Sequence, residues 1–426
     1  MIKKYFNLIA MNRNFRWLWI GLSISYLGDA LYNIAISWYV FIKTGSSLQV
    51  GMVLVLTFLP KVLFGLFLGV LVDRYNRKTL MQLAQIIQAI VTMILALSMM
   101  FDFFQLWILY SVTICLSITS SIFTPSQNAL IPKLVDREQI ITANSFFSSS
   151  QQIAQLFAVI LGGSLISLWG AGYAIGLNSL SFIVAFLFVS LMKGKAVLED
   201  GGDNYKKTFD KKIFREMREG FQWLGRNRIL LSVLILATIA NIALGSINVL
   251  APMMIKKGFG ANASSFAVFE GAMFLGILVG SIVIGLARPR RTGILFNLAL
   301  AVQGFGMFVI FLAPNLIIAD IGNFVLGLAL IAVILPVSTS FQTLVPSQLR
   351  GRVSSINNMI TSISIPVTYA VLGLIGDSFG AKICFFISAL LLLVCSLIGF
   401  SLKGLKNLTL TTSSPKIGHN NQSVQH

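Results

Sequence analysis

The chain has 426 residues, of which 56% are hydrophobic and only 11% are charged, and its mean hydropathy is +0.85. A soluble domain carries about 25% charged residues, so this composition excludes a string of soluble domains and predicts an integral membrane protein. The formal net charge of +18 could suggest a nucleic-acid partner, but the positions of the basic residues along the chain argue against one.

Twelve apolar segments are long enough to cross a bilayer as helices. We predict spans at 17–42, 48–72, 79–101, 104–126, 140–167, 171–192, 229–255, 263–287, 292–312, 316–343, 353–376 and 380–402. Of the 32 Lys and Arg residues, four lie in the loops of one side and Lys61 lies inside a span, which leaves 27 for the side of the termini. The positive-inside rule therefore predicts a multi-pass protein of the cell membrane with both termini in the cytoplasm.

The two parts of the chain are related by a near-constant offset. Asn12-Arg13 before the first span matches Asn227-Arg228 before the seventh at an offset of 215 residues, which also carries Asn33 onto Asn248. We therefore predict an all-α membrane protein of twelve transmembrane helices in two six-helix pseudo-repeats. The expected parts are an N-terminal half at 1–192, a cytoplasmic linker with an amphipathic helix at 193–227, a C-terminal half at 228–403 and a disordered tail at 404–426. The amphipathic helix either braces the two halves or is a tether with incidental lipid contact.

Ionisable side chains inside a bilayer are rare, so each one is a functional hypothesis. Three lie well inside a predicted span: Asp29, Lys61 and Glu270. Asp29 and Lys61 lie at similar depth on adjacent antiparallel helices, so they either form a structural ion pair or share a water-filled cavity. Glu270 has no basic residue in its span, and a carboxyl group in such surroundings resists ionising. Asp29 and Glu270 are therefore the candidate proton carriers, although a glutamate hydrogen-bonded near the outer mouth is an alternative for Glu270.

The first span carries a face that suits a substrate. Tyr26, Asp29 and Asn33 share one side of the helix, and Trp38 lies further along. An aromatic face with one acid suits a bulky amphiphile, including a cationic one. The remaining candidates for the cavity are Lys61, Asn241, Asn248, Asn358 and Tyr369. Helix packing explains each of these polar residues equally well when it is taken alone.

The sequence contains no pattern that predicts an enzyme. The only histidines, His419 and His426, lie in the predicted tail, and the HExxH, GxSxG and P-loop patterns are absent. We expect no cofactor and no metal site, and we expect a monomer whose partners are a small amphiphilic substrate, protons and the lipid bilayer. Because the P-loop pattern of an ATPase is absent, the energy for moving a solute would come from an ion gradient.

A charged hairpin separates the second and third spans, and it reads Gly69-Val-Leu-Val-Asp-Arg-Tyr-Asn-Arg-Lys78. It resembles the signature loop between helices 2 and 3 of the major facilitator superfamily. With the runs at 14–21, Gly28-Asp29, 44–46 and Leu59-Pro60, the chain resembles the macrolide-efflux branch, a group like the drug:H⁺ antiporters that also includes siderophore exporters and a lysophospholipid transporter. The resemblance implies alternating access, in which two halves rock about a central cavity.

The resemblance also implies a gate, whose residues are Gly69, Asp73, Arg74, Arg77, Lys78 and Arg352. Asp73 would cap the N-terminus of the eleventh span near Arg352, Arg77 would support it electrostatically, and Gly69 would let helices approach closely. Two features depart from the family pattern. Ala158-Val159 stands where efflux members carry a Gly-Pro pair, and Lys61 stands where we expect an uncharged residue.

These observations predict a secondary transporter that exports amphiphilic organic compounds, drug-like or macrolide-like, in exchange for protons. One alternative is an exporter or flippase-like transporter of an endogenous metabolite such as a siderophore or a lysophospholipid. The other alternative is a membrane receptor or assembly partner that transports nothing.

Overall fold

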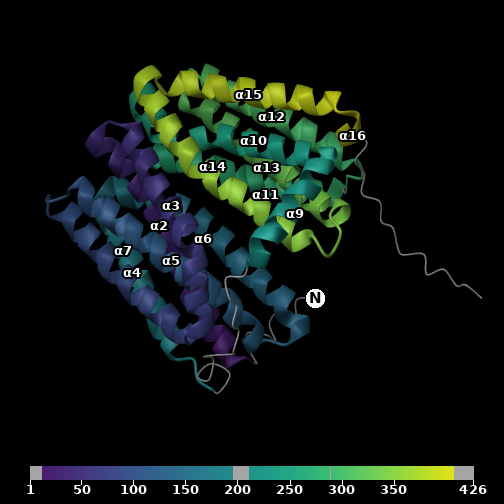
Figure 1. Cartoon of the computed structure of the whole chain (residues 1–426). Helices are drawn as coiled ribbons and strands as arrows, with labels where there is room; N and C mark the ends of the chain where they lie inside the picture. Colours follow the sequence, from purple (N-terminus) through teal and green to yellow (C-terminus); the bar gives the residue numbers. More distant parts are fainter. Residues whose placement is uncertain (1–11, 195–210, 288, 407–426) are drawn as a thin grey trace, which may run out of the picture.

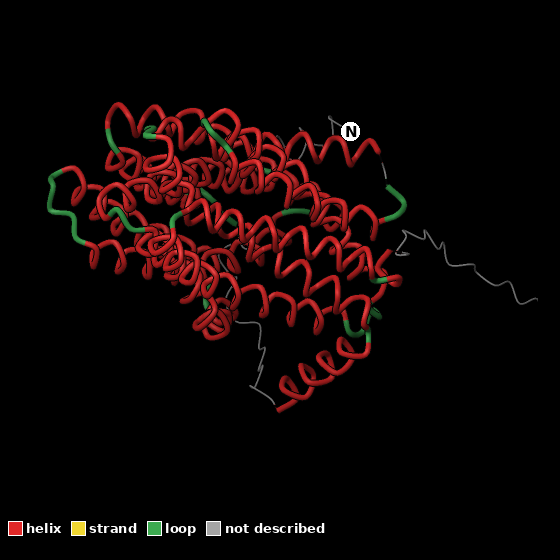
Figure 2. The backbone as a smooth tube through the Cα atoms, turned by 90° about the horizontal axis from the view of Figure 1, so that it is seen from above, coloured by secondary structure: helices red, strands yellow, loops and turns green. Residues whose placement is uncertain are grey.

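A computed structural model describes residues 12–194, 211–287 and 289–406, and twelve helices of at least 20 residues fill most of these ranges (Figure 1). They are α2 (Arg13–Thr44), α3 (Ser47–Arg74), α4 (Arg77–Met100), α5 (Leu106–Leu134), α6 (Ile140–Trp169), α7 (Ala171–Ser190), α10 (Arg228–Met253), α11 (Ala263–Ala287), α12 (Thr292–Leu312), α13 (Leu316–Leu344), α14 (Arg350–Phe379) and α15 (Ala381–Ser401). Shorter elements are a 3₁₀ turn (Arg137–Gln139), α9 (Lys211–Arg226), a π-helical turn (Met254–Gly258) and α16 (Lys403–Lys406). The described residues form helices and loops without any strand (Figure 2).

Eleven of these helices are long and apolar enough to cross a membrane. The remaining long helix is α2, which has 32 residues but does not meet the same measure of hydropathy. Its central stretch contains Tyr26, Asp29 and Asn33, and such polar groups lower its hydropathy. The one long helix that is not among these eleven is thus the one to which the sequence assigned a polar face.

Asparagine side chains start several of the helices. The side-chain oxygens of Asn12, Asn76, Asn227 and Asn315 accept hydrogen bonds from the free amides of α2, α4, α10 and α13. Asparagine is a favoured N-cap because its side chain satisfies an amide that lacks a partner within the helix. Asn12 and Asn227 are the residues matched at the offset of 215, so the repeat in the sequence corresponds to equivalent helix starts in the structure.

The helices pack in two groups that follow one plan. In the first group α2 packs on α6 and α7, α4 on α5 and α7, and α3 on α5. In the second group α10 packs on α14 and α15, α12 on α13 and α15, and α11 on α13. Each pair of the first group has its counterpart in the second, which is the arrangement expected for two six-helix pseudo-repeats. We call α2–α7 the first half and α10–α15 the second half.

Two ends of the molecule can be distinguished. We call the end where α2 and α10 begin the terminal end. The opposite, distal end carries the turns at 45–46, 259–262 and 380. In Figure 1 the purple turn between α2 and α3 lies beside the yellow-green turn between α14 and α15, at the upper left. The halves therefore meet at the distal end.

Glycines allow the helices of the two halves to touch closely near the distal end. A Cβ on Gly51 of α3 would lie 2.4 Å from the carbonyl oxygen of Tyr369 in α14, and one on Gly373 would lie 2.8 Å from the Cα of Leu48. The other pair, α6 and α11, behaves in the same way, since a Cβ on Gly163 would lie 2.9 Å from the Cα of Ser264. Both contacts are therefore made by backbone atoms that a side chain would hold apart.

Helix α9 belongs to the predicted linker and projects from the bundle (Figure 2). Its C-terminal part docks on α14 of the second half, where Leu224 is buried with Val353 and Ile356. Arg352 of α14 donates to the Glu219 carboxylate at 2.6 Å. The stretch 195–210 and the tail beyond 406 lie outside the described residues, whereas residues 404–406 of the predicted tail are part of α16.

Candidate functional site

The polar face of α2 lies near the middle of that helix. Asn33 is exposed, although most of its neighbours in α2 are buried or half-buried. Tyr26 is half-buried, and its hydroxyl accepts a hydrogen bond of 3.1 Å from the side-chain amide of Gln127 in α5. Asp29 lies between them in sequence, at the position where α2 contacts α7. The face predicted from the sequence is therefore present, and Gln127 fixes one of its members.

Asn178 of α7 lies beside Asp29, and the sequence analysis missed it. This side chain is 1% exposed and lies within reach of the Asp29 carboxyl group. Its own side-chain oxygen accepts a bond of 3.1 Å from the Ser181 hydroxyl, which leaves the amide NH₂ free to donate. Gly28 makes the contact possible, because a Cβ there would lie 2.2 Å from the Ser181 Oγ. In the sequence, the glycine next to an intramembrane acid was the one sign that another helix comes close to Asp29.

Lys61 lies near the middle of α3, within the range of an electrostatic interaction with Asp29. No nitrogen–oxygen distance of 4.0 Å or less joins these two described side chains, so they do not form a direct ion pair. The Lys61 ammonium instead lies 5.5 Å from the centre of the Phe58 ring. Leu59 and Leu63, two residues away on either side, are exposed. Two residues correspond to about 200° around a helix, so Lys61 projects from the opposite side of α3.

The second half contributes a matching set of polar groups. Asn241 and Asn248 are exposed on one face of α10, seven residues apart, and Asn358 is exposed on α14. The Asn248 amide donates to the Tyr369 hydroxyl at 3.4 Å. The Tyr369 ring lies 6.1 Å from that of Phe58, which carries Lys61 above it. The structure thus joins Asn248, Tyr369, Phe58 and Lys61 across the two halves.

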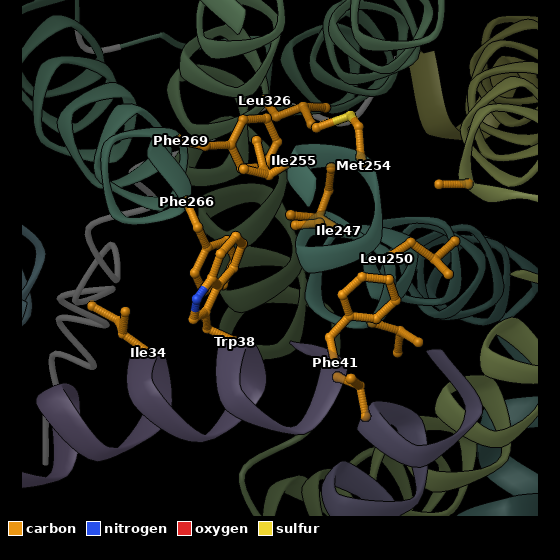
Figure 3. Packing of buried hydrophobic residues seen from close by; sticks show 14 of the residues in the cluster. Ile34, Trp38, Phe41, Ile247, Leu250, Met254, Ile255, Phe266, Phe269 and Leu326 are labelled. Atoms are coloured by element: carbon orange, nitrogen blue, oxygen red, sulfur yellow. The ribbon is translucent and has the colours of Figure 1, made fainter. Parts of the chain in front are cut away.

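Trp38 occupies a different place from the one expected. It is only 7% exposed and stacks on Phe266 of α11, with ring centres 5.7 Å apart. Figure 3 shows Trp38 and Phe41 of α2 pointing toward Phe266, Leu250 and other apolar residues of α10 and α11. We call this cluster at the distal end, which contains Trp38, Phe41, Leu250 and Phe266, the distal seal. Trp38 is therefore part of the closure between the halves in this structure.

Two acids lie in the distal part of the second half. Glu270 is half-buried, one helical turn from Phe266 on the same face of α11, so it lies just on the terminal side of the distal seal. Asp320 lies in the second turn of α13, and its Oδ1 is buried without a hydrogen-bond partner. The sequence analysis did not single out Asp320, because it lies close to the end of its predicted span.

The structure describes contacts for several residues of the predicted gate. Lys78 donates to the carbonyl oxygens of Ser190 and Met192 at 3.2 and 2.7 Å, so it caps the C-terminal end of α7 within the first half. Arg352 pairs with Glu219, as described above. A Cβ on Gly69 would meet nothing within 4 Å, so the expected close approach is not made there. Arg74 is exposed and Arg77 is half-buried, while the Asp73 side chain lies outside the described set.

Comparison with known proteins identifies relatives over nearly the whole chain. The family described as transmembrane secretion effector matches residues 9–425. Macrolide efflux protein A of Streptococcus pyogenes is 27% identical over 390 residues, which cover 90% of this chain and 94% of that protein. An uncharacterised MFS-type transporter of Bacillus subtilis is 24% identical over 369 residues, or 87% of each chain.

Solved structures show the same fold at low sequence identity. A bacterial homologue of the human lysosomal transporter Spinster superposes with a TM-score of 0.72 at 15% identity, covering 92% of this chain and 98% of that chain. The nucleoside transporter NupG superposes with a TM-score of 0.73 at 13% identity, covering 91% and 98%. These likenesses concern the arrangement of the helices alone.

Proposed function

The chain belongs to the transmembrane secretion effector family of the major facilitator superfamily, and from this premise we propose that it exports amphiphilic organic compounds in exchange for protons. It is a multi-pass membrane protein and a secondary transporter, not an enzyme. In the proposed cycle the two halves rock, so that a central site between them opens alternately to each face of the membrane. Both termini lie in the cytoplasm in this proposal, as the basic loops favour.

One observation carries the proposal. Polar side chains at mid-helix, above all Asn33 on α2 and Asn241 and Asn248 on α10, are exposed in helices whose other faces are packed. At the distal end α2 meets α10 and α11 in the distal seal around Trp38 and Phe266. A polar interior that is closed at one end is what a transporter needs in order to accept a solute from the other side. Aromatic rings beside the polar groups suit a solute with an apolar body.

Asp29 is the proposed site of proton exchange. An acid inside a membrane helix exchanges protons only if it can be both charged and neutral there. Asn178 lies beside it with an amide NH₂ that can donate a hydrogen bond to the charged form. Glu270 is the second candidate, because it lies next to the seal that must open when the substrate leaves on the distal side.

The substrate class follows from the relatives and from the side chains together. The streptococcal relative is named for macrolide efflux, and macrolide-like amphiphiles are therefore the first compounds to test. Lys61 favours a second candidate, an endogenous amphiphile whose head group is anionic or zwitterionic, such as a siderophore or a lysophospholipid. Lys61 and Asp29 interact electrostatically but form no direct ion pair, so a head group that carries both charges could bridge them.

Reconstitution into liposomes tests the proposal. Vesicles with an imposed pH gradient would be loaded with a macrolide, a cationic dye or a zwitterionic lysolipid, and movement of each compound would be followed. We expect substrate movement that requires the gradient and stops when a protonophore is added. If the gradient changed the movement of none of these compounds, the proton-coupled exporter would be rejected. Preference for the lysolipid over the macrolide would favour the second candidate.

A further inference from the structure

Two charged residues of the second half lie at the turn that joins α2 to α3 in the first half. Asp377 comes from the last turn of α14, and Lys257 comes from the π-helical turn that follows α10. The turn itself consists of Gly45 and Ser46, which end α2 and begin α3. Both charges therefore reach across the boundary between the halves at the distal end.

Asp377 caps the N-terminus of α3. Its carboxylate accepts hydrogen bonds from the amide nitrogens of Ser47 at 2.5 Å and Leu48 at 3.1 Å, and from the Ser46 hydroxyl. These are the first amides of the helix, which have no partner within it, and they form its positive end. An acid from the second half thus satisfies the start of a helix in the first half.

Lys257 caps the C-terminus of α2. Its ammonium donates to the Gly45 carbonyl oxygen at 2.9 Å and lies 5.3 Å from the centre of the Phe41 ring. Gly45 has φ +65° and ends α2, so its carbonyl belongs to the negative end of that helix. The two charges from the second half therefore match the opposite dipole ends of two consecutive helices in the first half.

We propose that Asp377 and Lys257 form a distal latch, which holds the distal end closed by capping α3 and α2 across the boundary between the halves. Opening the distal end separates the halves and breaks both caps, because their donors and acceptors lie on opposite sides of the boundary. The latch therefore shifts the population toward the distal-closed state, and its strength sets how readily the protein opens there. The inference rests on the proposed alternating access but needs neither the substrate nor the proton.

The latch lies beside a natural reporter position. Ser47 is 0% exposed, and its hydroxyl contacts the Met253 sulfur of α10 at 3.2 Å, so its side chain is enclosed between the halves. A Ser47→Cys substitution is nearly isosteric and keeps the backbone amide that Asp377 binds. The new thiol becomes accessible to a water-soluble reagent only when the distal end opens.

The test measures how fast this thiol forms a mixed disulfide with a charged methanethiosulfonate reagent, which releases methanesulfinate, in the full chain in lipid nanodiscs without substrate. Mass spectrometry of the peptides separates its modification from that of Cys115, Cys384 and Cys395. Asp377→Ala, which removes the acceptor oxygens, and Lys257→Met are each introduced into the Ser47→Cys protein. We expect each to raise the rate about fivefold, the factor that corresponds to the loss of one helix cap, and the double variant to raise it further.

The control is Asp102→Asn, because asparagine tolerates the positive φ of 55° at this position and alanine does not. Asp102 pairs with Lys43 at 3.5 Å, so this substitution removes a distal ion pair that lies wholly within the first half. This variant should leave the rate unchanged. Unchanged rates in both latch variants would overturn the proposal, as would an equal rise in the control. Thermal melting shows that each variant is folded, and the two latch variants test the caps independently. Because no substrate is present, a failed transport assay would reject the proposed function without touching this result.

Discussion

Helices α2 and α10 occupy equivalent places in the two halves, yet their central faces differ in one respect. At the offset of 215, Tyr26, Asp29 and Asn33 of α2 correspond to Asn241, Leu244 and Asn248 of α10. Both faces expose an asparagine, but only α2 carries an acid. The two halves therefore share the way their helices pack, but only the first half has an acid at this position. Four predictions, in order of decreasing expected effect, test this reading.

The largest effect is expected for Asp29→Asn. Removal of the titrating group should reduce substrate movement driven by a pH gradient at least about 100-fold, the range in which proton transfer contributes to rates. The measurement is gradient-driven efflux from liposomes at equal protein content. Asp320→Asn makes the same chemical change in a membrane helix of the other half and should leave the rate within about twofold. Full activity of the Asp29 variant would remove the acid from the mechanism and leave Glu270 as the proton carrier.

Gly28→Ala should have the next largest effect, and its main readout is stability. The new Cβ would lie 2.2 Å from the Ser181 Oγ and 2.5 Å from the Asn178 Oδ1, so α2 and α7 must move apart. Overpacking of this kind lowers the free energy of unfolding by about 1–3 kcal/mol. The counterpart of Gly28 in α10 is already Ala243, which marks this close approach as special to α2. Thermal melting in detergent measures the change.

Gly65→Ala is the matched control for that variant. Gly65 also lies inside a long helix, but a Cβ there would meet nothing within 4 Å. Its melting temperature should stay the same or rise slightly, because alanine favours a helix by about 1 kcal/mol over glycine. An equal loss of stability in both variants would show that the α2–α7 contact is not the cause.

Lys61→Gln should change preference more than rate. Without the Lys61 ammonium, the site loses a positive charge that acts on Asp29. We expect cationic compounds to bind about five- to tenfold more tightly and zwitterionic ones more weakly, since close charges in a partly buried site contribute about 1 kcal/mol or more. Competition between a cationic and a zwitterionic amphiphile of equal chain length measures the ratio. An unchanged ratio would mean that Lys61 does not face the substrate.

The smallest effect is expected for the exposed asparagines. Asn33→Ala and Asn248→Ala each remove one polar contact, worth about 0.5–1.5 kcal/mol, so apparent affinity should fall between about two- and tenfold. Asn248 also binds the Tyr369 hydroxyl, whereas no such bond is recorded for Asn33 among the described residues. The fall should therefore be larger for Asn248. Equal effects would argue that the bond to Tyr369 does not hold the site in shape.

The helices were predictable from the sequence because each is a long apolar run between polar turns. The offset of 215 located equivalent starts at Asn12 and Asn227, and both residues cap helices as such a repeat requires. The polar face of α2 was visible for a similar reason. Asp29 and Asn33 interrupt an apolar pattern, and an interruption inside a membrane span has few explanations.

Contacts between distant segments could not be predicted in this way. Asn178 is one of several polar residues in α7, and only the structure brings it to Asp29. Trp38 was expected in the cavity because it follows the polar face, but it lies nine residues beyond Asp29, or about 14 Å along the helix. That distance carries it into the distal seal. Asp377 gave no signal, because its partners lie 329–331 residues earlier in the chain.

The glycine contacts between the halves bear on how the molecule moves. Where side chains interlock, one surface can slide over another only after many torsion angles have changed. At Gly51 and Gly373 the backbones of α3 and α14 touch with little between them, and α6 meets α11 in the same manner at Gly163. These two contacts, which few side chains interlock, would let the halves rotate against each other as rigid bodies. The rate of the transport cycle would then depend on a few polar contacts between the halves and hardly at all on repacking of the apolar side chains.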